Sequence, residues 1–586
     1  MNETTPGREI VQIVELVQPF CANTFGSAPC TATGTGATKC YNTRATCQDT
    51  VNFALGTPLS LFFSRGNVAD RGVVGAPYII PSLLSVSTAP TKINLAVSDR
   101  NSQGLGQRAL CTIVFQDHPH TDRRVDPYVD ERPWDPMSAD RGSFWSRWLV
   151  RNRYRQNIEI KVYEGYAGQT LAEMKMRRYF LSDVSQVSAD GRVTIRGKDI
   201  LARVEERKAQ APQASPGLLF TGINASATSF LVANAVIDDY PASGTLRINS
   251  EIMTYTGRST SGDNVLFTGV TRGRDNTVAD AHDVDDAVQE CLRYTAQPVD
   301  TLLTDLLTTW GGIDPSWLDT ANWATEVGTY LSFYDLTALI TEPQSVSKLI
   351  SEIQEQALCF LWWDERESLI KLRAVRGIDE QPDLLTEGVN VIATSVTFTE
   401  KPKERASQVW VYYNQNDFTE DEDKPKSYKS QFVIANLESE TDELYGEPSI
   451  RKIYGRWLPS DALAQNTASK IITRYVDVPA QIRFRLDAKD RNYWVGDTVE
   501  IEHFRDVDQY GEKRRRFWMI TSAEEKRPGE LIEYVAEDTT LYGRINYIMA
   551  DSAPDYPGAA SAPFRNCYIG DASGLLSDGS PSGRIL

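Results

Sequence analysis

The sequence lacks the features that would assign it to a membrane or an export route. Its 586 residues contain no run of about eighteen apolar residues, which excludes an ordinary membrane-spanning helix. The opening MNETTPGREI has no basic region followed by an apolar stretch, so we expect no secretory signal. We therefore expect assembly in a cytoplasm, where thiols stay reduced. That setting makes disulfides the less favoured state for the eight cysteines.

Catalytic motifs are also missing. No glycine-rich phosphate loop, nucleophile elbow or His-Glu metalloprotease motif occurs, and no cysteine stands in a recognisable protease signature. Only four histidines are present, and DHPH, which contains His118 and His120, fits an exposed loop better than a metal chelate. AHDVDD at 281–286 lacks the spacing of a calcium loop and is typical of a polar turn. Nothing in these residues indicates an enzyme.

Positive charge is scarce in most of the chain. There are 61 Lys and Arg against 79 Asp and Glu, a net charge of −18. That balance argues against a nucleic-acid-binding surface, because such a surface is basic and displaces the counterions of the phosphates. Residues 141–210 are the exception, with 15 basic and 8 acidic side chains, which leaves about −25 for the remainder. We interpret this arginine-rich segment as a solvated face or a subunit contact.

What the chain does contain is mostly strand pattern. Apolar and polar residues alternate and stop at Gly, Asp or Asn, which predicts half-buried strands. In the first part of the chain these strands are expected at 9–17, 91–99, 108–117, 157–166 and 192–201. Helical spacing predicts helices at 298–312, 345–357 and 460–476. The sequence predicts a mainly β, multidomain protein of β-barrel or β-sandwich domains, with a minority of helices and an irregular N-terminal loop.

Shifts in composition divide the chain into six predicted units. The Pro- and Ala-rich AQAPQASPG at 209–217 marks one boundary, and the short strands that follow it are typical of an inserted module. The units are a cysteine-rich segment (1–52), a first β-rich domain (53–216), the inserted module (217–292), a helical α+β domain (293–387), a second β-rich domain (388–552) and an extended arm (553–586).

Four of the cysteines fall in one Gly-, Thr- and Asn-rich stretch. Cys21, Cys30, Cys40 and Cys47 have the spacing C-x8-C-x9-C-x6-C, without the tight pair typical of structural zinc sites. Each thiolate comes from a separate turn, which suits an iron–sulfur cluster, with zinc and then two disulfides as alternatives. Because the loop has few large apolar side chains to offset its ordering entropy, we expect metal–thiolate bonds to order it.

These residues also resemble a known family. VELVQPFCANTFGSAPC followed by KCYNTRATCQDTVNF is similar to the cysteine segment of tail-tip proteins of long-tailed bacteriophages and gene transfer agents. The iron–sulfur minor tail protein of lambda-like phages has the same outer spacings and a longer middle gap. The resemblance covers about 50 residues. It implies that Cys21, Cys30, Cys40 and Cys47 bind a four-iron–four-sulfur cluster, which makes the N-terminal loop metal-bound.

The rest of the chain resembles the baseplate hub of siphovirus tails in its order of β-rich domains, inserted module and helices. The resemblance implies a virion protein of the tail tip, assembled in the host cytoplasm as a homotrimer. Its implied partners are the distal tail and tail tube proteins, the tape-measure protein and a central fibre or tip protein. The module at 217–292 resembles small domains that touch host glycans. DNA would pass through the ring without specific binding.

Three further expectations depend on this interpretation. An acidic or neutral wall would let DNA slide, and the arginine-rich segment, including Arg151, Arg153 and Arg155, would then face neighbouring tail proteins. Two alternatives to the hub are a receptor- or glycan-binding protein and a cell-wall hydrolase. Five tryptophans are expected in the core, with a subunit interface as the alternative. They are Trp310, Trp317, Trp323, Trp362 and Trp363.

Overall fold

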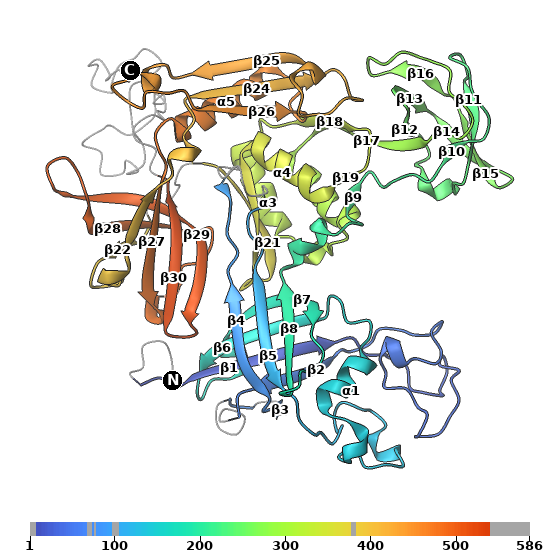
Figure 1. Cartoon of the computed structure of the whole chain (residues 1–586), viewed down its shortest axis with the longest axis vertical. Helices are drawn as coiled ribbons and strands as arrows, with labels where there is room; N and C mark the ends of the chain where they lie inside the picture. Colours follow the sequence, from blue (N-terminus) through green and yellow to red (C-terminus); the bar gives the residue numbers. More distant parts are fainter. Residues whose placement is uncertain are drawn as a thin grey trace.

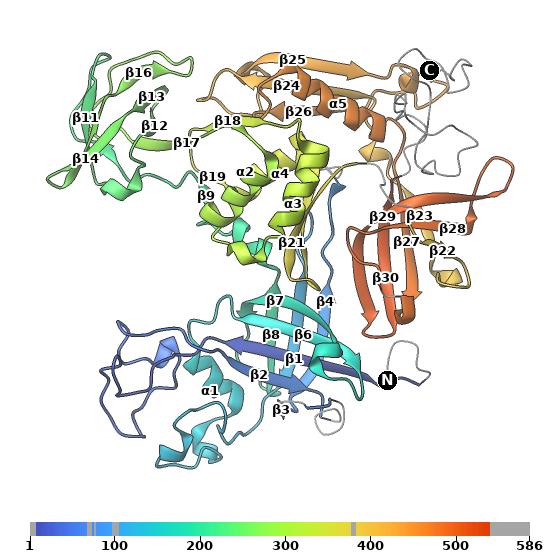
Figure 2. The same cartoon turned by 180° about the vertical axis from the view of Figure 1, so that it is seen from behind.

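The structure is a computed structural model, and it describes residues 7–66, 73–75, 78–95, 105–376, 382–490 and 492–539. Within these residues the chain forms seven sheets and five α-helices. The prediction of a mainly β, multidomain protein is therefore confirmed. The larger sheets are arranged around a central helical region (Figures 1 and 2). The predicted arm at 553–586 lies outside the described residues.

An eight-stranded sheet, in the lower part of Figure 1, carries the N-terminal loop. Its strand order is β3-β2-β1-β6-β7-β8-β5-β4. The bounds are β1 Ile10–Gln18, β2 Leu59–Ser64, β3 Ile79–Ile80, β4 Leu83–Ala89, β5 Leu110–Gln116, β6 Glu159–Tyr166, β7 Lys175–Val184 and β8 Arg192–Lys198. Because β1 and β2 pair antiparallel up to Gln18↔Leu59, residues 19–58 leave and re-enter the sheet at one end.

Both faces of this sheet are covered near β1. Val14 and Leu16 pack in one apolar cluster with Trp145 and Trp148 of α1 (Phe144–Arg151), whereas Val11 belongs to a second cluster. The helix α1 has no counterpart in the sequence predictions, because its eight residues are too few to show a helical period clearly. This helix contacts the cysteine loop through the carbonyl oxygen of Arg151.

The helical region forms the largest apolar core. Its helices are α2 (Val299–Asp305), α3 (Thr320–Glu326) and α4 (Val346–Ala357), and α2 and α3 continue into π-helical turns at Leu306–Trp310 and Val327–Leu331. The helices predicted at 298–312 and 345–357 are present. Ser345 caps α4 by accepting a hydrogen bond from the Lys348 N–H at 3.3 Å. The hairpin of β20 (Cys359–Asp364) and β21 (Leu369–Ala374) packs beside these helices.

The five tryptophans belong to apolar cores within the monomer. Trp323 and Trp363 are 1% and 0% exposed in the helical core, and Trp310 and Trp317 pack against it. Trp362 lies in the neighbouring core of the six-stranded sheet. Core burial, the interpretation favoured from the sequence, is therefore confirmed.

The segment 217–292 has its own apolar core, between a four-stranded sheet (β10-β11-β15-β14) and a five-stranded sheet (β16-β13-β12-β17-β18). The bounds are β10 Leu218–Leu219, β11 Ser229–Ala233, β12 Gly244–Ile248, β13 Glu251–Tyr255, β14 Gly257–Ser261, β15 Asn264–Thr268, β16 Thr271–Arg274, β17 Val288–Gln297 and β18 Leu336–Ile340. The strand β17 pairs with β12 up to Cys291 and with β18 from Leu292 onward. One strand thus joins the module to the helical region.

The C-terminal part of the described chain contains a three-stranded sheet with α5 (Asp461–Tyr475) and a six-stranded sheet. The helix predicted at 460–476 is therefore present. The bounds are β24 Gln408–Gln415, β25 Tyr428–Ala435 and β26 Ile450–Gly455 in the first sheet, and β22 Leu384–Thr386, β23 Thr397–Glu400, β27 Ala480–Asp487, β28 Thr498–Val507, β29 Lys513–Arg527 and β30 Leu531–Asp538 in the second. Two further strands, β9 Gln210–Ala211 and β19 Gln344–Ser345, pair with each other.

The strand predicted at 91–99 is wrong for its described part. Residues 91–95 form only isolated bridges, in which Lys92 meets Gln107 on one side and Ser522 on the other. Ile93 and Leu95 are buried, but in the core of the six-stranded sheet. Their alternation reflects a connection that packs against a distant sheet, and periodicity alone does not distinguish the two cases.

Candidate functional site

The four cysteines of the N-terminal stretch converge in the structure. Cys21, Cys30, Cys40 and Cys47 line one small cavity in the loop between β1 and β2, and all four are partly exposed, free thiols. The Cys21 N–H donates to the carbonyl oxygen of Asn42 at 2.8 Å. This hydrogen bond brings the turn after Cys40 next to the start of the loop.

Asp49 joins the turns that follow the second and fourth cysteines. Its carboxylate accepts hydrogen bonds from the Thr31 N–H at 2.7 Å and the Thr31 hydroxyl at 2.9 Å. The side-chain amide of Asn52 donates to it at 3.0 Å. The Thr31 N–H and then the Asn52 amide lower the pKa of Asp49 to about 2. The two turns are therefore connected through ordinary polar contacts.

Arg132 comes from outside the cysteine stretch and holds three of its backbone carbonyls. The guanidinium donates to the carbonyl oxygens of Gly36, Lys39 (2.9 Å) and Cys40 (3.1 Å). Asp126 accepts from Arg132 Nε at 2.9 Å, and both side chains are 2% exposed. Burial lowers the pKa of Arg132, but Asp126, together with Tyr41 and Cys40, raises it above its usual value. The Arg132 guanidinium thus holds the turn that carries Cys40, and the ion pair with Asp126 keeps this guanidinium oriented.

A second attachment links the same turn to α1. Arg151 lies over the ring of Tyr41, 3.9 Å from its centroid, and its carbonyl oxygen accepts a hydrogen bond from the Thr43 hydroxyl at 2.6 Å. The Arg151 guanidinium also pairs with Asp122 at 2.7 Å. The Arg151 side chain therefore faces the cysteine loop, whereas Arg153 is exposed.

Other members of the arginine-rich segment also pair within the chain. Arg147 lies 3.3 Å from Asp122, and Arg178 lies 2.6 Å from Glu159. Asp122 lies outside 141–210 and offsets part of the segment's positive charge, whereas Glu159 is already counted among its acidic residues. The segment is therefore less basic as a surface than as a sequence.

The thiols influence one another. Burial raises the pKa of Cys40, a hydrogen bond with Asn42 lowers it, and the other three thiols raise it further. Such mutual repulsion disappears when thiolates bind a cation. In the described ranges, no three His, Cys, Asp or Glu side chains lie close enough to surround one metal ion.

The remaining cysteines and the histidine pair lie elsewhere. Cys111, Cys291 and Cys359 are buried and free, and Cys567 lies outside the described residues. The rings of His118 and His120 are 5.9 Å apart, and the first stacks on Phe144. His120 is 5% exposed and its Nδ1 accepts the Asp122 N–H at 2.9 Å. The expected exposed loop is therefore wrong for His120, which packs beneath α1.

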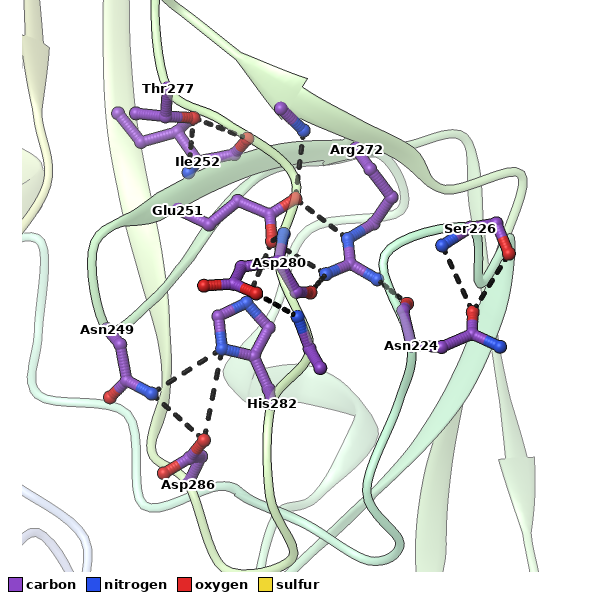
Figure 3. Close-up of polar contacts among 12 residues, drawn as sticks. Asn224, Ser226, Asn249, Glu251, Ile252, Arg272, Thr277, Asp280, His282 and Asp286 are labelled. Carbon is purple, nitrogen blue, oxygen red and sulfur yellow. Dashed lines mark hydrogen bonds and ion pairs between the residues drawn. The ribbon is translucent and has the colours of Figure 1, made fainter.

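The inserted module contains a buried ionic network, shown in Figure 3. Arg272 makes two hydrogen bonds to the Glu251 carboxylate, at 2.8 and 2.6 Å. The N–H groups of Gly273 (2.8 Å) and Asp280 (3.2 Å) donate to the same carboxylate. His282 Nε2 lies 2.8 Å from Glu251 Oε2. The polar turn predicted at 281–286 thus contributes a buried side chain.

This network connects four segments of the module. The Arg272 guanidinium also donates to the carbonyl oxygens of Asn224 and Asp280 (2.6 Å), and the side chains of Glu251, Arg272 and His282 are 1%, 6% and 3% exposed. Because these groups satisfy one another and are closed to solvent, we interpret the network as structural support.

The supports of the cysteine loop were missed by sequence reasoning. Arg132 lies 93 residues after Lys39, whose carbonyl oxygen it contacts, and both Arg132 and Asp126 lie outside the arginine-rich segment, so neither spacing nor composition connects them to the loop. Of Asp126, Arg132 and Arg151, only Arg151 lies in the arginine-rich segment 141–210. These contacts depend on β1 and α1 meeting in space.

Comparisons with known proteins give structural similarity only. No protein-family model and no curated protein matches the chain. The 43 kDa tail protein of prophage MuSo2 from Shewanella oneidensis aligns at 10% identity and a TM-score of 0.36, over 78% of this chain and 97% of that one. A tail protein from Neisseria meningitidis MC58 aligns at 11% identity and 0.29, over 56% and 93%. A chain of a gene transfer agent virion aligns at 12% and 0.29, over 59% and 94%. Similarity at this level does not assign a function. Separately, no described helix is long and apolar enough to cross a membrane.

Proposed function

We propose that the protein is a structural component of a phage tail tip, with a four-iron–four-sulfur cluster held by Cys21, Cys30, Cys40 and Cys47. The observation that carries the proposal is the convergence of these four free thiols on one cavity, in a segment whose sequence resembles the iron–sulfur tail protein. When bound, the cluster supplies four metal–thiolate bonds that cross-link separate turns of the loop.

The donor set fits this group. Four thiols without a disulfide are present, and Arg132 places a guanidinium beside the Cys40 turn. A single zinc ion needs all its ligands within about 2.3 Å of one centre, whereas the four thiolates of an iron–sulfur cluster bind four different irons. The amounts of iron, acid-labile sulfide and zinc in the purified protein therefore distinguish the two.

The cluster then acts on a loop that already has protein contacts. The contacts of Arg132, Thr43 and Asp49 hold three of its turns, and the metal–thiolate bonds would add to these contacts. We propose that the metal stiffens a pre-shaped loop. This role requires no electron transfer.

The hub assignment goes with the same proposal. The protein would form a trimeric ring in the virion, between the tail tube with its distal tail and tape-measure proteins and a central fibre or tip protein. The net charge of −18 and the internal pairing of Arg147, Arg151 and Arg178 support an inner wall that does not bind DNA. A basic inner wall in a reconstruction of the particle tip would contradict it.

The test of the metal centre is chemical. Anaerobically purified protein should contain iron and acid-labile sulfide in equal amounts, and Cys40→Ser should lose most of both. Cys567→Ser, which alters a cysteine outside the loop, is the matched control and should keep them. One equivalent of zinc without sulfide would contradict the proposal.

A further inference from the structure

Asn42 contacts two of the four cysteines of the N-terminal loop. Its side-chain Oδ1 accepts a hydrogen bond from the Cys40 thiol, with the oxygen and the sulfur 3.4 Å apart, and its backbone carbonyl oxygen accepts the Cys21 N–H at 2.8 Å. The residue is 8% exposed and lines the cavity on which the four thiols converge. Asn42 therefore touches one sulfur directly and holds the backbone at another cysteine.

The backbone and the side chain of Asn42 have separate requirements. The backbone is left-handed, with a φ of 52°, a conformation that Gly adopts freely and Asn and Asp adopt more readily than other side chains. Gly would satisfy this conformation and the hydrogen bond to Cys21. Within the described ranges, the hydrogen bond with Cys40 is the only one that the side-chain amide makes. A reason for the amide must therefore be sought at the Cys40 sulfur.

The contact between Asn42 and Cys40 can be made in two directions. A thiol donates its S–H to the amide oxygen, whereas a thiolate, the form that binds metal, has no hydrogen and only accepts. Turning the amide over exchanges its oxygen with its NH2 group, and the NH2 group can donate to the sulfur. The same side chain can thus hold the Cys40 sulfur with or without metal.

Cys47 provides the contrast. Its thiol donates to the backbone carbonyl oxygen of Asp49, with the two atoms 3.2 Å apart. A carbonyl oxygen has no hydrogen to donate, so this hydrogen bond is lost when the Cys47 sulfur is a thiolate. Of these two loop thiols, only that of Cys40 has a partner that can donate as well as accept.

We propose that Asn42 is a positioning residue for the metal centre and donates a side-chain N–H to the Cys40 sulfur in the metal-bound state. The inference rests on the proposed function, because it requires a metal–thiolate centre at these cysteines. Groups that orient a metal ligand through a hydrogen bond typically contribute about ten- to a hundredfold to metal affinity. Hydrogen bonds to the sulfurs also influence the reduction potential of an iron–sulfur cluster.

The test compares the wild type with two variants, all purified anaerobically as full chains. Asn42→Gly keeps the left-handed backbone and the carbonyl that accepts from Cys21, but it has no amide. Asn42→Asp keeps an acceptor for a thiol, but it has no N–H for a thiolate. When an excess of chelator is added, both variants should release iron about ten- to a hundredfold faster than the wild type.

Asn23→Ala is the matched control. Asn23 lines the same cavity, but its side-chain amide donates to the backbone carbonyl oxygen of Asn52 at 2.6 Å and not to a sulfur. The variant therefore removes an amide from the same cavity without removing a hydrogen bond to a metal ligand. It should release iron at a rate within about threefold of the wild-type rate.

Two further measurements separate this role from a purely structural one. An N–H donor stabilises the negative charge that reduction adds, so the reduction potential should be lower in Asn42→Gly, by up to about 59 mV for a tenfold preference in a one-electron step. In the metal-free chain, Asn42→Asp should retain the wild-type hydrogen-exchange protection of residues 21–47, because the carboxylate still accepts the Cys40 S–H.

The outcomes distinguish this inference from the proposed function. Release of iron at the wild-type rate from both Asn42 variants would overturn the inference alone. Loss of amide protection in the metal-free Asn42→Asp chain, or an unchanged reduction potential in Asn42→Gly, would also overturn it, because Asn42 would then only shape the loop. A wild-type protein without iron and acid-labile sulfide would contradict the proposed function and this inference with it.

Discussion

Among isosteric substitutions of polar side chains in the inserted module, Glu251→Gln should lower the free energy of unfolding of the module the most. The carboxylate accepts hydrogen bonds from Arg272, Gly273 and Asp280 and lies beside His282. Glutamine offers one acceptor oxygen in place of two and carries no charge. It would leave the Arg272 guanidinium buried without its counterion.

The magnitude follows from the burial of the pair. Breaking a buried, hydrogen-bonded ion pair by removing one partner costs about 3–5 kcal/mol. A unit of the module's size, at about 0.05–0.15 kcal/mol per residue, has a stability of roughly 4–11 kcal/mol. The substitution should therefore remove a large part of the module's stability without unfolding its neighbours, because the module has its own core.

The assay is hydrogen exchange of the full chain, in which peptides from 217–292 report opening of the module. Glu251→Gln should lower their protection by roughly a hundredfold or more, since each 1.4 kcal/mol is a factor of ten. Protection in the eight-stranded sheet should not change. A fall of less than fivefold in the module would refute the reasoning.

Glu290→Gln is the matched control. Glu290 lies in the same module, and burial raises its pKa to about 7, so replacing it with a neutral amide should leave stability unchanged or raise it at pH 8. Glu251 behaves in the opposite way. Burial opposes its ionisation, but Arg272 and the neighbouring donors lower its pKa to about 2. Its contribution is therefore complete above the ordinary carboxyl value and is lost as the pH falls through about 2.

Three other changes test the remaining supports. Arg132→Met should lower amide protection in the cysteine loop at least tenfold, because it leaves Asp126 buried without its partner at a cost of about 3 kcal/mol. Unchanged protection would mean that the loop does not depend on Arg132. Replacing 217–291 with a short Gly/Ser linker should give a soluble, folded chain, since β17 changes partners after Cys291. Loss of the melting transition measured by circular dichroism would show that the rest of the chain needs the module to fold. Ser345→Ala removes the cap of α4 and should cost about 1 kcal/mol in chemical denaturation, whereas no measurable change would show that the cap is redundant.

The positions of the regular elements were largely accessible from the sequence. The strand at 9–17 and the helix at 460–476 are present as β1 and α5, because their apolar residues follow one period over most of their length. The segment 91–95 was misassigned because its buried Ile93 and Leu95 contact the distant six-stranded sheet. Local alternation carries no information about which surface covers a residue.

The sequence alone predicted which cysteines meet, because four thiols in one short Gly- and Thr-rich stretch need only short loop closures, which cost little entropy. It could not provide Arg132, which is 92 residues from Cys40 along the chain and reaches the Cys40 carbonyl only in the folded protein. Nor could it place Glu525 of the six-stranded sheet 4.0 Å from Arg177 of the eight-stranded sheet. Burial removes the solvent that makes such groups independent, and only tertiary structure decides which charges are then left facing each other.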